Sequence, residues 1–160
     1  MRRILAAGAV LFFAMAAQAN AQVRGFETWY GLYTVEGVQI VDDPSAPSGK
    51  RRVGGRIKEP AQNSDRIQLT PGSYFGFGYV LQDSGGATSV QVRHVQLIPP
   101  PGITDNQGRV HDSLQSDLNL STNRDLFIGI SMGERTVKGV WTMQVWEGGR
   151  VLLERKFTLY

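Results

Sequence analysis

The chain has 160 residues, of which 41% are hydrophobic and 19% are charged, and its formal net charge is +3. This length corresponds to one domain with a hydrophobic core of its own. The sequence contains no cysteine, which excludes disulfides, thiolate metal sites, a cysteine nucleophile and the lipidated cysteine of a bacterial lipoprotein.

The first 21 residues have the pattern of a secretory signal peptide. A doubly basic start precedes an apolar run of about 14 residues, shorter than the roughly 20 residues that a transmembrane helix needs. Ala19-Asn20-Ala21 then places small residues at the positions that a signal peptidase reads. We therefore expect a signal peptide over residues 1–21 with cleavage after Ala21, or alternatively after Ala19, and no stable membrane insertion.

Export changes the charge balance of the mature protein. Arg2 and Arg3 lie in the expected signal peptide, so 15 of the 17 basic residues stay with the mature chain, against 14 acidic residues, for a formal charge of +1. Bulk electrostatics therefore gives no reason to expect nucleic acid as a partner. The expected product is a single domain over residues 22–160, in the bacterial periplasm or secreted.

The mature chain predicts a succession of short strands and no long amphipathic helix. In chain order, a first strand is expected over residues 26–36, which could continue over 38–41 after a turn at Gly37. Further strands are expected over residues 53–58, 66–70, 73–82, 90–97, 109–121 and 125–132, followed by a closing hairpin over residues 139–160. Gly148-Gly149 separates the two arms of this hairpin, as a tight turn requires. The pattern indicates an all-β protein, an antiparallel immunoglobulin-like (Greek-key) β-sandwich of about eight strands.

Alternation along the strands identifies the residues expected to face the core. They are Tyr30, Leu32, Phe75, Phe77, Tyr79, Val90, Val92, Phe127, Ile130, Trp141, Met143, Val145 and Phe157. Gly76 and Gly78 leave the opposite face of strand 73–82 nearly bare, which allows an aromatic ring or another backbone to lie close against the sheet. A ligand groove over these glycines is the alternative interpretation.

In two of the predicted strands, the apolar residues switch from one face of the strand to the other along its length. In the strand that ends at Leu97, Val90 and Val92 share one register while Val95 and Leu97 share the other, so a β-bulge is expected near Arg93-His94. In the last strand the apolar stripe switches faces before Phe157. Either a bulge near Leu153-Glu154 or partial cover on both faces of the hairpin explains this switch.

Four segments give the chain a resemblance to a known family. They are Tyr30-Gly31-Leu32-Tyr33, Phe75-Gly76-Phe77-Gly78-Tyr79, the region from His94 to Gly102, and the closing segment with Gly139-Val140-Trp141-Thr142, Val145-Trp146, Gly149-Arg150 and Phe157-Thr158. In this order they resemble a bacterial family known as domain of unknown function 3859. The resemblance implies a β-sandwich of uncharacterised role and carries over no catalytic residues.

The sequence offers little that is typical of catalysis. It has no G-x-S-x-G elbow, P-loop or dinucleotide fingerprint, and its acidic residues lie mostly at turns such as the one at Asp105, where they cap backbone groups. We therefore predict no catalytic residues, no metal and no cofactor. The alternative is a small hydrolase or metal-dependent enzyme with its site on the Pro99–Asp112 loop, which requires His94, His111 and Asp112 to converge.

A non-catalytic binding or interaction module is the preferred prediction. Trp29, Tyr33 and Trp146 are aromatic residues that do not all fit inside one small sandwich, so they are the candidate interaction surface. The expected partner is an unknown protein, peptide or glycan, which binds a sheet face or adds to a strand edge. Trp146 is the decisive residue, because it lies on the strand face opposite to Trp141.

Overall fold

The computed structural model describes residues 22–44, 49–59 and 63–160. The expected signal peptide over residues 1–21 lies outside the described residues. Within the described part, no helix is long and apolar enough to cross a bilayer.

The described residues form eleven β-strands and no helix. The strands are β1 (Val23–Asp42), β2 (Lys50–Glu59), β3 (Arg66–Ile67), β4 (Tyr74–Asp83), β5 (Ser89–Leu97), β6 (Ile103–Thr104), β7 (Val110–His111), β8 (Ser113–Ser121), β9 (Asp125–Ser131), β10 (Gly139–Glu147) and β11 (Arg150–Leu159). Eight of them have seven residues or more, and β3, β6 and β7 have two residues each. The all-β prediction is confirmed. The count exceeds the expected one of about eight because β6 was not predicted and because the expected strand over residues 109–121 is divided into β7 and β8.

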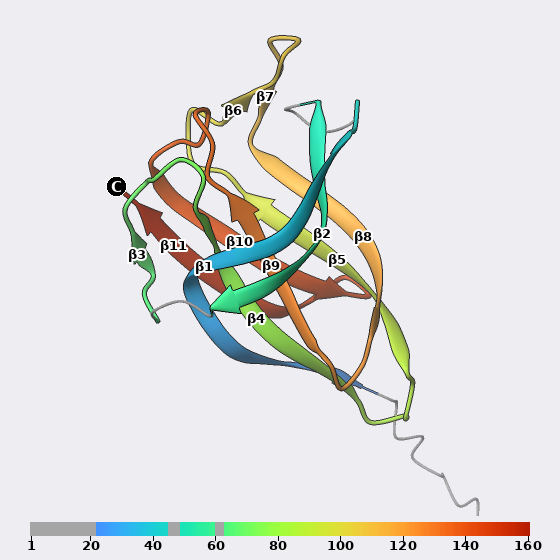
Figure 1. Cartoon of the computed structure of the whole chain (residues 1–160). Coiled ribbons are helices and arrows are strands. Elements are labelled where there is room, and N and C mark those ends of the chain that lie inside the picture. Colours follow the sequence, from blue (N-terminus) through green and yellow to red (C-terminus); the bar gives the residue numbers. More distant parts are fainter. Residues whose placement is uncertain (1–21, 45–48, 60–62) are drawn as a thin grey trace, which may run out of the picture.

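The strands form two stacked sheets and a small hairpin (Figure 1). One sheet has four strands in the order β2-β1-β4-β9, and the other has five in the order β3-β11-β10-β5-β8. All pairs are antiparallel except β11 with β3. The β6–β7 hairpin lies at one end of the sandwich, close to the paired ends of β1 and β2 at Asp42 and Lys50, and the turns joining β4 to β5 and β8 to β9 lie at the other end.

The core between the sheets contains the predicted aromatic and aliphatic residues of β4, β10 and β11. Phe75, Phe77, Tyr79, Trp141 and Phe157 are all fully buried. The Phe75 ring contacts the rings of Trp141 and Phe157 edge-on, at centroid distances of 5.7 and 5.4 Å. Edge-to-face packing of this kind is favourable beyond the apolar area it buries, so these rings anchor the two sheets to each other.

Two of the predicted core residues are exposed. Leu32 is 39% exposed because β2 pairs with β1 only from Thr34 onward, which leaves Leu32 at the margin of the sheet. Phe127 is 44% exposed because it lies opposite Gly78, on the outer face of the four-stranded sheet. The prediction for Phe127 was wrong because alternation along a single strand does not specify which parity faces the core. Leu32 is paired with the buried Phe75 and so has the predicted parity, but its position at the margin leaves it exposed.

The closing hairpin contains the predicted bulge, one residue earlier than expected. Glu147 pairs with Arg150 across the Gly148-Gly149 turn, but Val145 pairs with Leu153, which leaves Leu152 as the extra residue. The bulge places Phe157 opposite Trp141, so that both rings enter the core. The bulge predicted near Arg93-His94 was wrong.

On β5 the register is continuous from Ser89 to Leu97 against β8, and the pairing with β10 has no shift either. His94 and Gln96 therefore share the inward parity of Val92. Val95 and Leu97 lie on the outer face of the five-stranded sheet. The apolar residues of β5 thus switch faces because two polar side chains, His94 and Gln96, lie inside the sandwich. The strand contains no bulge.

The bare glycine face is covered by aromatic rings of β1. A Cβ on Gly78 would overlap the Trp29 indole, and one on Gly129 would overlap the Tyr33 hydroxyl. A Cβ on Gly76 would overlap the backbone of Ile128 and Gly129, so the prediction that an aromatic ring or another backbone lies close against Gly76 and Gly78 is confirmed. The ligand groove that was considered over the same glycines is occupied by these side chains.

Candidate functional site

A groove with a volume of about 900 Å³ lies on the outer face of the five-stranded sheet. It is built on β5, with β10 on one side and β8 on the other. Arg93 of β5 stands between Trp146 of β10 and Asp117 of β8, and Val95 forms the next rung of this face. Because successive outward residues of a strand point the same way, the three strands place their side chains in rows across the groove.

Trp146 is half-buried in this groove, and its orientation is fixed by hydrogen bonds. The indole Nε1–H donates to Oε1 of Gln144 at 2.9 Å, and Nε2 of Gln144 donates to Oε2 of Glu154 at 2.6 Å. These bonds satisfy the polar atom of the indole. What Trp146 offers a ligand is therefore its aromatic ring, already held in place.

The floor of the groove is apolar at its centre. Val95 is only 8% exposed although it faces outward, and Leu97 continues the apolar strip at 41% exposed. The walls carry amide side chains from β5 and β8, namely Gln91, Gln115 and Asn119. An apolar centre with a few polar groups around it is the usual composition of a ligand site.

Arg93 and Asp117 form a two-pronged ion pair across β5 and β8. Arg93 Nε lies 2.7 Å from Asp117 Oδ1, and Arg93 Nη2 lies 3.3 Å from Asp117 Oδ2. The hydrogen bond to Asp117 raises the pKa of Arg93, and the same bond lowers the pKa of Asp117. Both groups stay charged at neutral pH, and their charges cancel within the groove.

The three predicted interaction residues do not form one surface. Trp29 and Tyr33 lie on the outer face of the four-stranded sheet, where their rings contact each other edge-on at 5.5 Å. Trp29 is half-buried, and Tyr33 is only 5% exposed, so its ring is not available to a partner. Trp146 lies on the opposite side of the molecule, in the groove. Phe127, which is 44% exposed, also belongs to the aromatic cluster of Trp29 and Tyr33, with its ring centroid 6.0 Å from that of Tyr33, and nothing in the sequence indicated this contact.

The residues of the alternative enzyme site do not converge. His94 bonds to Tyr79 in the interior, His111 bonds to Asp105 in the β6–β7 hairpin, and Asp112 accepts a hydrogen bond from Ser113 at 3.2 Å. Within the described ranges, no three His, Cys, Asp or Glu side chains are grouped so as to hold a metal. This geometry contradicts the arrangement that the hydrolase or metalloenzyme alternative requires.

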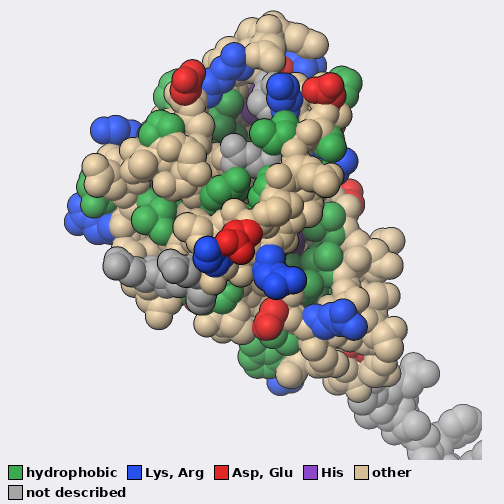
Figure 2. All heavy atoms as spheres, in the orientation of Figure 1, with side chains coloured by type: hydrophobic (Ala, Val, Ile, Leu, Met, Phe, Trp, Pro, Cys, Tyr) green, Lys and Arg blue, Asp and Glu red, His purple; other side chains and the backbone are tan. Residues whose placement is uncertain are grey.

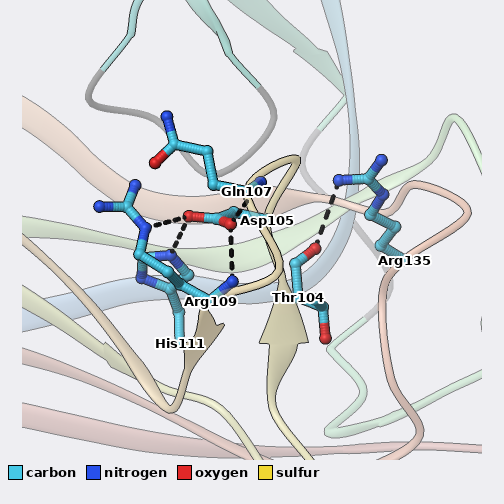
Figure 3. Close-up of polar contacts among 6 residues, drawn as sticks. All are labelled: Thr104, Asp105, Gln107, Arg109, His111 and Arg135. Carbon is cyan, nitrogen blue, oxygen red and sulfur yellow. Dashed lines mark hydrogen bonds and ion pairs between the residues drawn. The ribbon is translucent and has the colours of Figure 1, made fainter.

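Asp105 organises the β6–β7 hairpin (Figure 3). Its side chain is 3% exposed and accepts hydrogen bonds from the backbone N–H groups of Gln107 (2.8 Å) and Arg109 (2.9 Å). Arg109 Nε and His111 Nε2 lie 2.7 and 3.0 Å from Oδ2. The hydrogen bond with His111 contributes most to lowering the pKa of Asp105 well below its usual range, despite an opposing effect of burial. The turn-capping role expected of Asp105 is confirmed, whereas the sequence did not indicate the contact with His111.

A second, smaller cleft opens between the two sheets at the β8 and β9 edges. Its volume is about 490 Å³, and its walls are largely aliphatic, with Leu114, Leu118 and Leu126 among them. Gln96 Nε2 donates to the backbone oxygen of Gly129 at 3.0 Å and thereby links the sheets across the cleft. The polar groups at its base are engaged within the protein, so the cleft offers fewer ligand contacts than the groove.

Charged side chains on the face seen in Figure 2 are mixed in sign. Lysine and arginine side chains are interspersed there with aspartate and glutamate, and with hydrophobic groups. This face carries no large patch of one charge. The picture agrees with the near-neutral charge of residues 22–160, which gives no reason to expect a polyanionic partner.

The comparisons with known proteins agree with this architecture. A family model described as "Domain of unknown function (DUF3859)" matches residues 22–159. The chain belongs to this family. The resemblance drawn from the four sequence segments is therefore confirmed, and DUF3859 covers the whole of the sandwich described above.

The DUF3859 chain also has a relative among solved structures. An immunoglobulin-like protein from Pseudomonas aeruginosa is 22% identical in sequence and superposes with a TM-score of 0.63. The match covers 89% of this chain and 99% of that one. At this identity the likeness concerns the fold, which is an immunoglobulin-like β-sandwich. No curated protein matches the chain.

Proposed function

We propose that this DUF3859 protein is an exported, non-catalytic binding module of the bacterial periplasm. Its ligand site is the groove on the outer face of β5, β8 and β10. The observation that supports the proposal most is Trp146, a large aromatic ring fixed by Gln144 beside a nearly buried Val95 in an open groove. Pre-positioned aromatic rings lose little conformational entropy on binding and commonly dominate contact energies.

The mode of binding follows from the position of β5. This strand is hydrogen-bonded to β10 on one side and to β8 on the other. Its backbone groups are therefore used within the sheet. A ligand in the groove meets side chains, whereas strand addition would take place at the free edge of β8 and outside the groove.

The proposal is tested by labelling the protein with 5-fluorotryptophan and recording ¹⁹F NMR spectra. The sequence has three tryptophans, so three resonances are expected, each assigned by a single Trp→Phe substitution. Addition of a bacterial cell-envelope extract should shift the Trp146 resonance and leave that of the fully buried Trp141 unchanged. A spectrum in which only Trp29 responds, or in which no resonance responds, would refute the groove as the site.

A further inference from the structure

The lining of the groove also specifies what kind of molecule fits it. We infer that the groove binds an uncharged glycan chain, with Trp146 packed against the face of a sugar ring. This inference rests on the proposed function, because it names the ligand class of the same site. It is carried by three features of the groove: its charge, its hydrogen-bonding groups and its aromatic ring.

The groove has no net charge to select an ion. Arg93 and Asp117 are its charged lining residues, and each satisfies the other through two hydrogen bonds. The remaining lining side chains are amides, aliphatic groups and the indole. An anionic polymer would have to break this ion pair or approach it without compensation, and a cationic one meets the same obstacle.

The polar groups of the groove match hydroxyls. Amide side chains both donate and accept hydrogen bonds, as hydroxyl groups do. Three amides reach the groove with exposed residues, namely Gln91, Gln115 and Asn119, and Gln144 adds a fourth beside Trp146. A ligand with many neutral donors and acceptors can satisfy these amides without leaving a buried charge unpaired.

Trp146 supplies the apolar contact that a sugar needs. Its Nε1–H is already bonded to Gln144, so the ring face and not the nitrogen is presented. The axial C–H groups of a pyranose form a flat, weakly positive surface, and an aromatic face is negative. Val95 extends the apolar floor from this ring toward Leu97.

The length of the groove indicates an oligosaccharide and not a single sugar. Its outward residues on β5 run from Gln91 to Leu97, a rise of about 20 Å along an extended strand. The two glycines of the β10–β11 turn also line the groove, without side chains. A peptide of this length would bring backbone N–H and C=O groups that find no free strand edge here, because both edges of β5 are paired.

The test distinguishes this inference from the proposed function. The envelope extract that shifts the ¹⁹F resonance of Trp146 is divided. One part is treated with proteinase K, and the other with glycan-cleaving reagents, namely periodate, which cleaves vicinal diols, together with lysozyme and chitinase, which cleave the 1→4-linked N-acetylhexosamine chains that have no internal vicinal diol. The shift should disappear after the glycan-cleaving treatment and persist after proteinase K. A shift that survives the glycan-cleaving treatment overturns the glycan assignment and leaves the groove as the site. An untreated extract with no effect overturns the proposed function itself.

Defined probes and variants complete the experiment. Cellohexaose, maltohexaose and chitohexaose are titrated by calorimetry alongside an uncharged Gly-Ser decapeptide, and at least one hexasaccharide should bind where the peptide does not.

W146A should weaken that binding at least tenfold, and W146Y, which keeps a flat ring, should weaken it by less than about threefold, in the range of aromatic contact energies. Q115A should also weaken binding, and Q68A, an exposed glutamine outside the groove, should not. Equal affinity of W146A and the parent protein for the hexasaccharide would overturn the role of the ring.

Discussion

The Tyr79 hydroxyl lies 2.5 Å from Nε2 of His94 and joins the two sheets inside the sandwich. Burial raises the pKa of Tyr79 far above its usual value and lowers the pKa of His94 to about 4. Tyrosine therefore stays protonated and histidine stays neutral at neutral pH, and the ring tautomer decides which of the two donates the hydrogen bond. The pair is a polar link between β4 and β5 inside the sandwich, and it satisfies two groups that would be costly to bury alone.

This pair makes the stability of the protein sensitive to mild acid. Because the folded state lowers the pKa of His94 from 6.5 to about 4, the unfolded chain takes up a proton at a higher pH than the folded one. The stability that depends on neutral His94 is complete above pH 6.5 and is lost as the pH falls toward 4. The loss should reach about 3 kcal/mol, as measured by urea unfolding at a series of pH values. H94Q should flatten the slope in this window, and H111Q should retain it. An unchanged slope in H94Q would contradict the prediction.

The contact between Trp29 and Gly78 should be sensitive to a single added methyl group. A Cβ on Gly78 overlaps the indole, so G78A must displace the ring or the strand, at a cost of about 1–3 kcal/mol in the free energy of unfolding. Thermal or urea unfolding measures this cost, and the resonance or fluorescence of Trp29 reports the displacement. G133A is the matched control, because a Cβ on Gly133 has no neighbour within 4 Å. Equal stability of the two variants would disprove close packing on the glycine face.

Asp105 should hold the β6–β7 hairpin without determining the global stability. In D105N the backbone N–H groups of Gln107 and Arg109 lose a charged acceptor, and their amide exchange should accelerate about tenfold or more. D112N, at an exposed position, is the control. Because the pKa of Asp105 is lowered in the folded state, its contribution is complete above the usual aspartate pKa of about 3.9 and is lost only as the pH falls below that value. Protection of the hairpin should therefore persist at pH 4.

The expected export of the protein has a direct chemical test. Expressed with its own N-terminus in a bacterial host, the protein should be recovered from the periplasm starting at Gln22, or at Asn20 if the alternative site is used. Intact-mass measurement separates the two. Replacing both Ala19 and Ala21 by leucine should block processing, since the peptidase accepts only small residues there. Recovery of the uncleaved parent chain from the cytoplasm would contradict the proposed location.

The sequence predicted the fold better than it predicted the site, and β10 and β5 show why. On β10, Trp141, Met143 and Val145 alternate with polar residues, and all three are fully buried as predicted. On β5 the same logic failed, because His94 and Gln96 occupy inward positions. Their partners, Tyr79 and the Gly129 carbonyl, come from the other sheet and cannot be inferred from neighbours in sequence.

The groove could not be predicted from the sequence, because it too depends on strands that are distant in sequence. Trp146 was singled out by its position opposite to Trp141, but its neighbours in the groove come from β5 and β8, distant in sequence. An assumed bulge at Arg93-His94 made Val95 appear to face the core. Pairing between strands assembles the site, and pairing is a long-range property that composition and alternation do not contain.

Because Leu152 is an extra residue in β11, the number of residues between the turn and Phe157 is constrained. Between the Gly148-Gly149 turn and Phe157, the number of residues decides which side of the sheet each side chain occupies. Loss of one residue in this interval would turn Phe157 and Leu159 out to solvent and bring Lys156 and Thr158 into the interior. Relatives of this protein should therefore vary in the length of the turn itself but gain or lose residues in this interval only in pairs.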